Sequence, residues 1–132
     1  MFLDASAIVA ILAQEPESKA LTEKLEAAPS CMTSPLSRYE AVLALRRIYN
    51  VDSVEGPMGA INDFLELYDV RIVDVTPEIG SKAIAAFERY GKGRHKAGLN
   101  MGDCFSYACA RLHRVPLLCK GDDFRHTDIK IA

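Results

Sequence analysis

Short apolar runs alternate with longer amphipathic stretches along the 132-residue chain. Residues 2–6 read "FLDAS", an apolar run interrupted by Asp4, and predict a short buried strand. In residues 16–29 the apolar side chains recur every three or four positions, which is the helical period. The whole pattern predicts helices over 6–15, 16–29, 35–50, 53–68, 76–91 and 101–114, and strands over 2–6, 31–34, 70–75, 115–119 and 129–132.

The third predicted helix, residues 35–50, begins at Ser34-Pro35, a pair that suits a helix start. Its apolar positions are expected to form the buried face. These positions are Leu36, Tyr39, Val42, Leu43 and Leu45.

Alternation of short strands with helices predicts an α/β fold: one domain over residues 1–132, with a mostly parallel sheet covered on both faces. In such sheets, functional groups gather where the strands reach their carboxyl ends. Between the last two helices, residues 91–100 read "GKGRHKAGLN" and predict a basic, glycine-rich loop.

Composition limits the classes of protein to which the chain can belong. The hydrophobic fraction is 49%, the charged fraction 26% and the net charge −2, so any nucleic-acid surface must be a local patch. The N-terminus carries no basic signal region and no apolar run approaches the roughly 20 residues that span a bilayer. We therefore expect a cytoplasmic protein with no membrane association. The four cysteines show no metal-ligand spacing and are expected to be free, buried thiols: Cys31, Cys104, Cys109 and Cys119.

Acidic residues stand at or near the ends of several core elements. Asp4 ends the first strand, Glu40 lies among apolar neighbours in "SRYEAVLAL", and Asp103 lies in the first turn of the last helix. Asp122 and Asp123 follow the strand "PLLC". Each has an ordinary explanation: a helix cap, a solvated edge, a dipole partner or a turn.

A parallel sheet would bring several of these carboxylates into one crevice, where they would repel each other. A divalent cation resolves that conflict, and oxygen ligands without His or Cys favour Mg²⁺ or Mn²⁺. Such an ion activates water and neutralises charge on a phosphodiester. The pattern therefore indicates a metal-dependent nuclease site.

Four ordered segments resemble the PIN-domain ribonucleases, specifically the VapC toxins of type II toxin–antitoxin modules. They are "FLDASAIVAILAQEPE", "SRYEAVLAL", "YGKGRHKAGLNMGDCFSYACA" and "PLLCKGDDFRHTDI". The resemblance implies a PIN-like α/β/α sandwich that cuts RNA, such as tRNA or ribosomal RNA, with Mg²⁺ or Mn²⁺. It also implies inhibition by a VapB-type antitoxin and assembly as a homodimer.

The resemblance also assigns roles to individual residues. Asp4 and Asp103 are the implied metal ligands, and Glu40 is the implied second acid. Ser6 is implied to hydrogen-bond within the acidic network. Either Asp122 or Asp123 is the fourth acid, and the sequence leaves that choice open.

Basic residues near these acids are candidates for RNA contact. The candidates are Arg38, Lys92, Arg94, His95, Lys96, Lys120 and Arg125. An ordinary solvated loop is the alternative for residues 92–96, and His113 and His126 are expected to be solvated surface. No base-reading residue can be named.

Residues 16–72 contain apolar side chains that fit either a groove for an antitoxin tail or simple core. They are Leu45, Ile48, Tyr49, Phe64 and Leu67.

Two rival functions remain. A phosphoryl-accepting receiver domain also uses carboxylates at strand ends, but here Asp4 stands alone and Asp74 lies inside its predicted strand. A non-catalytic PIN-like module that binds RNA or a partner is the other rival. Metal-dependent RNA cleavage separates it from the nuclease.

Overall fold

The structure is a computed structural model that describes all of residues 1–132. Its centre is a four-stranded, all-parallel sheet with the order β3-β2-β1-β4. Phe2 of β1 is paired with Met32 on one side and Leu117 on the other. The strands are β1 (Phe2–Leu3), β2 (Cys31–Thr33), β3 (Val70–Ile72) and β4 (Leu117–Leu118).

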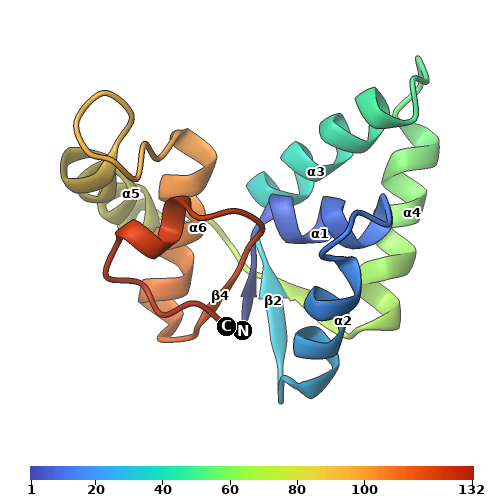
Figure 1. Cartoon of the computed structure of the whole chain (residues 1–132), viewed down its shortest axis with the longest axis horizontal. Helices are drawn as coiled ribbons and strands as arrows, with labels where there is room; N and C mark the ends of the chain where they lie inside the picture. The colour runs from blue at the N-terminus through green and yellow to red at the C-terminus, as the bar shows by residue number, and fades with distance from the viewer.

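Six α-helices and one short 3₁₀ helix surround this sheet (Figure 1). They are α1 (Ala5–Leu12), α2 (Ser18–Ala27), α3 (Pro35–Ile48), α4 (Glu55–Leu67), α5 (Pro77–Tyr90), α6 (Met101–His113) and η1 (Asp123–His126). The predicted α/β class and the parallel sheet with helices on both faces are confirmed. No helix has the length and apolar character needed to cross a membrane.

Two hydrophobic clusters hold these layers together, one on each face of the sheet. Neighbouring residues of a strand point to opposite faces, so Leu3 packs into one cluster and Phe2 into the other. The first cluster contains side chains of α1 to α4, and the second contains side chains of α5 and α6. Figure 1 shows the two groups of helices on opposite sides of the strands.

The predicted strands are longer than the strands in the structure. The strand expected over 70–75 ends at Ile72. The strand expected over 129–132 was wrong, because only an isolated bridge between Leu117 and Ile131 forms there. Strand length depends on how far a neighbouring strand continues, which local sequence does not specify.

The predicted buried face of α3 was partly wrong. Its buried residues are Ser37, Ala41, Val42 and Leu45. Tyr39 is 60% exposed, because two residues beyond Ser37 correspond to a rotation of about 200° around the helix. The polar Ser37 is buried against the core, whereas Tyr39, which the apolar pattern predicted to be buried, is not.

All four cysteines are free thiols. Cys31, Cys104 and Cys109 are buried as expected, and Cys119 is only half-buried.

Candidate active site

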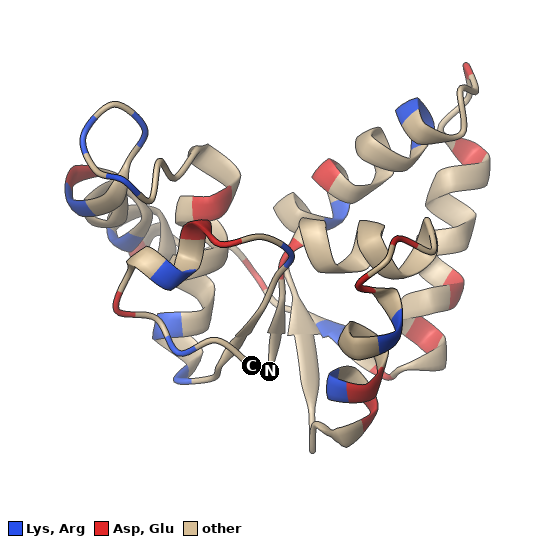
Figure 2. Ribbon diagram, in the orientation of Figure 1, with Lys and Arg blue, Asp and Glu red and all other residues tan.

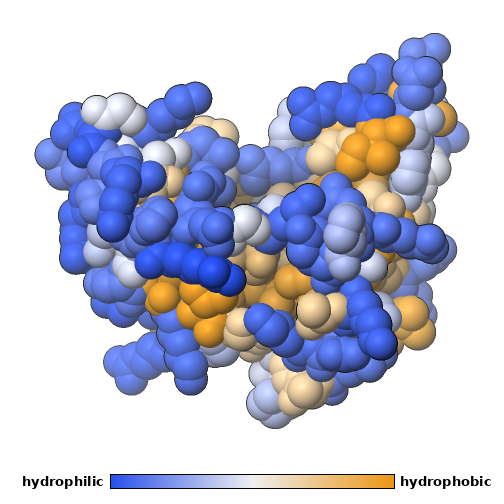
Figure 3. Space-filling model, viewed as in Figure 1, coloured by the Kyte–Doolittle hydropathy of each residue, from blue (hydrophilic) through white to orange (hydrophobic).

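The candidate site lies at the carboxyl end of the sheet, where three helices begin. Asp4 directly follows β1 and caps α1, Ser34 follows β2 and caps α3, and Asn100 caps α6. The chain therefore brings three helix N-termini, each carrying partial positive charge, to one edge of the sheet. Figure 2 shows acidic segments of both helical layers near this edge, and Figure 3 shows the surface hollowed between the two lobes on that side.

Asp4 is buried, with only 4% of its surface exposed. Its Oδ2 atom accepts hydrogen bonds from the backbone N–H of Ser6 at 2.9 Å and from the Ser6 hydroxyl at 2.5 Å. Its Oδ1 atom accepts one from the Ser106 hydroxyl at 2.7 Å. Three donors therefore replace much of the water that a buried carboxylate loses. Asp4 caps α1, which is the ordinary explanation that the sequence offered for it. It is also the centre of a wider polar network.

That network continues as a chain of hydroxyls. The Ser106 Oγ lies 3.3 Å from the Oγ of Ser37, which lies 3.0 Å from the Oγ of Ser34. All three serines are at most 1% exposed. The network thus joins β1, α3 and α6 through side chains alone.

Sequence reasoning missed Ser37 and Ser106. A signal was present for each. Ser37 follows the helix cap Ser34 by three residues and so lies in the same turn. Ser106 follows Asp103 by three residues on the otherwise apolar helix α6 and so lies on the acid's side of it.

Glu40 projects from α3 toward the N-terminal turn of α6. A Cβ atom placed on Gly102 would overlap the Glu40 carboxylate, so the missing side chain is what lets the acid sit against this helix. Burial, together with the charges of Asp4 and Asp103, raises the pKa of Glu40 to about 7. Gly102 is a third residue that sequence reasoning missed.

Asp103 occupies the first turn of α6 in a reciprocal cap with Asn100. The backbone N–H of Asn100 donates to Asp103 Oδ2 at 2.9 Å, and the Asp103 N–H donates to Asn100 Oδ1 at 3.0 Å. Burial raises the pKa of Asp103 to about 6, because the charges of Asp4 and Asp123 add to it and the Asn100 hydrogen bond only partly opposes it. Asp103 is therefore both an acid at a helix N-terminus and a member of the acidic group, so the two explanations offered for it are compatible.

The two candidates for the fourth acid differ in their partners. Asp122 pairs with Arg125 at 3.1 Å. Asp123 begins η1 and makes no ion pair, and its charge contributes to the raised pKa of Asp103. Both side chains are exposed. These differences favour Asp123, and the choice between the two stays a prediction.

The four acids suit a hard cation that keeps several water ligands better than a cation coordinated entirely by protein side chains. No three His, Cys, Asp or Glu side chains lie close enough to enclose an ion. Mg²⁺ retains several waters and needs only one or two protein carboxylates. The donor set is all oxygen, and a bound cation would offset both burial, the larger cause of the raised pKa values of Glu40 and Asp103, and the repulsion between the acids.

Comparison with known proteins identifies the family. The PIN domain model matches residues 1–130. A VapC ribonuclease of Mycobacterium bovis is 41% identical over 130 residues, covering 98% of this chain and 95% of that protein. The chain belongs to the VapC ribonucleases of the PIN-domain family. This membership excludes the receiver domain.

Solved PIN-domain structures share the fold at low identity. Mycobacterium tuberculosis VapC20, described as a sarcin-ricin loop cleaving toxin, gives a TM-score of 0.76 at 18% identity and covers 99% of this chain and 97% of its own. VapBC2 of Rickettsia felis, solved with a fragment of its promoter DNA, gives 0.70 at 15% identity and covers 99% and 96%.

Most basic residues expected to contact RNA around this PIN-domain site are engaged within the protein. Lys120 pairs with Glu15 at 2.5 Å, and its backbone N–H donates to Ser6 Oγ at 3.0 Å. Arg38 donates two hydrogen bonds to Asn62 Oδ1, at 2.7 and 3.2 Å. Lys120 thus fastens the turn after β4 to α1, and Arg38 joins α3 to α4. Each of the two therefore makes a contact within the protein, and contact of either with RNA stays a prediction.

The loop over residues 91–100 is only partly free. Arg94 pairs with Glu88 at 3.1 Å, and His95 Nδ1 accepts a hydrogen bond from the backbone N–H of Ala97 at 3.1 Å. Lys92 and Lys96 are exposed and make no ion pair. Two of the four candidates in this loop of the PIN domain therefore remain available to a ligand.

The apolar residues considered for a partner groove of the PIN domain divide into two sets. Leu45 and Phe64 are buried core. Ile48, Tyr49 and Leu67 are 50%, 44% and 76% exposed. Only the second set is open to a partner.

Proposed function

We propose that this PIN domain is a Mg²⁺- or Mn²⁺-dependent endoribonuclease toxin that hydrolyses RNA phosphodiester bonds. One observation carries the proposal. Three acids surround the N-terminal turns of α6: Glu40 lies against Gly102, Asp4 accepts a hydrogen bond from Ser106, and Asp103 lies in the first turn. Burial, with a contribution from the neighbouring acids, raises the pKa of Glu40 to about 7 and that of Asp103 to about 6. Acids arranged at this cost in stability are typical of a functional site.

Asp4 and Asp103 are the proposed metal ligands. When bound, the ion would supply an activated water and neutralise charge on the phosphate. Ser6 and Ser106 fix the orientation of Asp4, since each donates a hydrogen bond to a different oxygen of its carboxylate. Gly102 leaves room for Glu40 beside them.

Glu40 and Asp123 flank the proposed position of the reacting phosphate. We assign them to orient the attacking water, whose oxygen bonds to phosphorus in line with the departing ester oxygen. One proton leaves that water toward a carboxylate, and the departing oxygen gains a proton. The structure holds no Ser/His/Asp arrangement around these acids that would favour a covalent route.

The substrate and partners belong to the same proposal. The family relatives are named ribonucleases, and VapC20 is described as a sarcin-ricin loop cleaving toxin, which supports a structured RNA such as tRNA or rRNA as substrate. VapBC2 pairs a VapC with a VapB protein, which supports inhibition by a cognate VapB-type antitoxin. Homodimerisation remains a prediction.

The test is RNA cleavage by antitoxin-free protein. Wild type, Asp103→Asn and the matched control Asp63→Asn, an exposed acid on α4, are incubated with tRNA and ribosomal RNA in Mg²⁺, Mn²⁺ or EDTA. Asn at position 103 can still accept the Asn100 hydrogen bond but carries no charge.

Discrete cleavage by wild type and Asp63→Asn, abolished by EDTA and by Asp103→Asn, is the expected result. Equal cleavage by all three proteins would place the activity elsewhere. RNA binding without cleavage by wild type would favour the non-catalytic module.

A further inference from the structure

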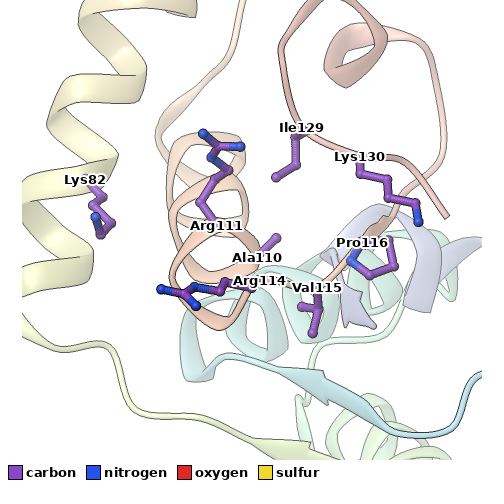
Figure 4. A pocket seen from close by; sticks show the side chains of 8 residues that line it. All are labelled: Lys82, Ala110, Arg111, Arg114, Val115, Pro116, Ile129 and Lys130. Atoms are coloured by element: carbon purple, nitrogen blue, oxygen red, sulfur yellow. The ribbon is translucent and has the colours of Figure 1, made fainter.

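A basic cleft lies at the opposite end of α6 from the acids. It has a volume of about 510 Å³ and is lined by Lys82 of α5, by the end of α6 with the turn into β4, and by the C-terminal segment. Figure 4 shows these three segments around the end of α6. Four of its eight lining residues are cationic and none is acidic: Lys82, Arg111, Arg114 and Lys130.

A second cleft of about 170 Å³ adjoins the first and shares Lys82 and Arg111 with it. It adds Arg89, so that five cations border one continuous basic surface. The only carboxylates paired with them are Glu78, with Lys82 at 3.7 Å, and Asp128, with two of the arginines at 3.6 and 3.7 Å. This local excess of positive charge contrasts with the net charge of −2 for the whole chain.

Two cations of the cleft have no partner at all. Arg114 and Lys130 make no ion pair and no side-chain hydrogen bond. Arg114 also caps α6 with φ +55°, a left-handed backbone conformation that non-glycine residues seldom adopt. Both charges are therefore free to meet an anion.

We propose that this cleft binds the phosphodiester backbone of RNA away from the bond that is cut. The inference rests on the proposed ribonuclease function. Guanidinium groups match phosphate oxygens in a two-pronged geometry. The other residues that line the cleft are apolar: Ala110, Val115, Pro116 and Ile129. Val115 and Pro116 are half-buried and offer a surface for ribose and base that a simple anion would not use.

The surroundings of the acid site leave a need for further phosphate contacts. Two of the basic residues expected near the acids are paired within the protein, Lys120 with Glu15 and Arg125 with Asp122, while Lys92 and Lys96 are exposed and unpaired. Cations of the cleft would add to the contacts made by the proposed metal ion and by these two lysines. From Asp103 to Arg114 the α6 axis rises about 16 Å, a distance that a few nucleotides of one strand can cover.

The experiment compares RNA binding by two double variants in the Asp103→Asn background, so that the RNA is not cut. Arg114→Gln with Lys130→Gln removes the two free charges of the cleft. Lys19→Gln with Arg47→Gln is the matched control, because it removes two exposed, unpaired cations from α2 and α3. Fluorescence anisotropy measures the Kd for labelled tRNA and for polyuridine over a range of salt concentrations.

We expect the cleft variant to bind both RNAs about tenfold more weakly than the parent. Its plot of log Kd against log salt for polyuridine should be shallower by about 1.4, the value for two lost phosphate contacts on a single strand. The control should change the Kd less than twofold. Arg114→Lys, which keeps the charge, should retain most of the binding, which separates loss of charge from loss of structure.

Several results would overturn the inference. One is equal Kd values for the parent and the cleft variant, and another is an equal loss in the control. Displacement of RNA by polyglutamate at matched charge would assign the cleft to an acidic protein segment, and displacement by inorganic phosphate would assign it to a small anion. If the wild-type protein cleaves RNA but the cleft variant binds RNA as tightly as the parent, only the proposed role of the cleft is refuted. A wild-type protein that cleaves no RNA refutes the proposed function.

Discussion

Neutralising Glu40 should stabilise the metal-free protein at alkaline pH while abolishing its activity. Glu40→Gln keeps the shape of the side chain but removes a charge that burial and two neighbouring acids disfavour. A stability gained by deleting a proposed active-site acid is the behaviour expected where function is built at the expense of stability.

The magnitude and the sign follow from the pKa. Folding raises the pKa of Glu40 from 4.5 to about 7. Because this pKa is raised in the folded state, its contribution to stability is complete below pH 4.5 and is lost as the pH rises through 7. The full shift corresponds to about 3 kcal/mol. Glu40 keeps some contact with solvent, so we expect Glu40→Gln to raise the free energy of unfolding by about 1–2 kcal/mol at pH 8.

Thermal unfolding of the two proteins in EDTA at pH 5 and pH 8 measures this difference. At pH 8 the Tm of Glu40→Gln should exceed that of wild type by about 3–8 °C. At pH 5 the difference should be much smaller, because the wild-type carboxyl is then largely protonated in the folded state and only its partial ionisation in the unfolded state still opposes folding. Glu23→Gln, an exposed and unpaired acid on α2, should show no such pH dependence. A Tm for Glu40→Gln at or below that of wild type at pH 8 would refute the reasoning.

Four further substitutions test the rest of the site. Gly102→Ala should leave the Tm almost unchanged but lower RNA cleavage about tenfold or more, because its Cβ displaces the Glu40 carboxylate; full activity would show that this close approach is dispensable. Asp123→Asn should lower cleavage about tenfold while Asp122→Asn stays close to wild type, and the reverse order would make Asp122 the fourth acid. Ser106→Ala should lower the free energy of unfolding in urea by about 1–2 kcal/mol, and an unchanged value would show that the buried aspartate does not need this donor.

The sequence predicted well those features that a local pattern encodes. The helical period and the capping residues located all six α-helices to within a few residues, as Ser34-Pro35 before α3 illustrates. Asp4, Glu40 and Asp103 stood out because each is an acid in an apolar setting, and the structure places Glu40 against Gly102 and Asp4 against Ser106 on the helix that carries Asp103. Asp4 is nonetheless satisfied by Ser6 and Ser106, an arrangement that composition alone cannot reveal.

The features that depend on distant neighbours could not be predicted. The last strand shrank to one bridge because the chain at Ile131 has only Leu117 to pair with. The ion pair of Lys120 with Glu15 could not be predicted, because Glu15 is far away in sequence and lies beside Lys120 only in the fold. Gly102 reads as an ordinary helix-start glycine until Glu40 is placed against it.

The central claim is that these acids tolerate one another because a divalent cation binds between them. Calorimetric titration of Mn²⁺ into wild type, Asp103→Asn and Asp63→Asn at pH 7.5 tests it directly. The account predicts saturable binding by wild type and Asp63→Asn, with release of protons as the raised pKa values of Glu40 and Asp103 fall, and binding at least about tenfold weaker in Asp103→Asn. Equal affinity in all three proteins, or no binding by wild type, would contradict it.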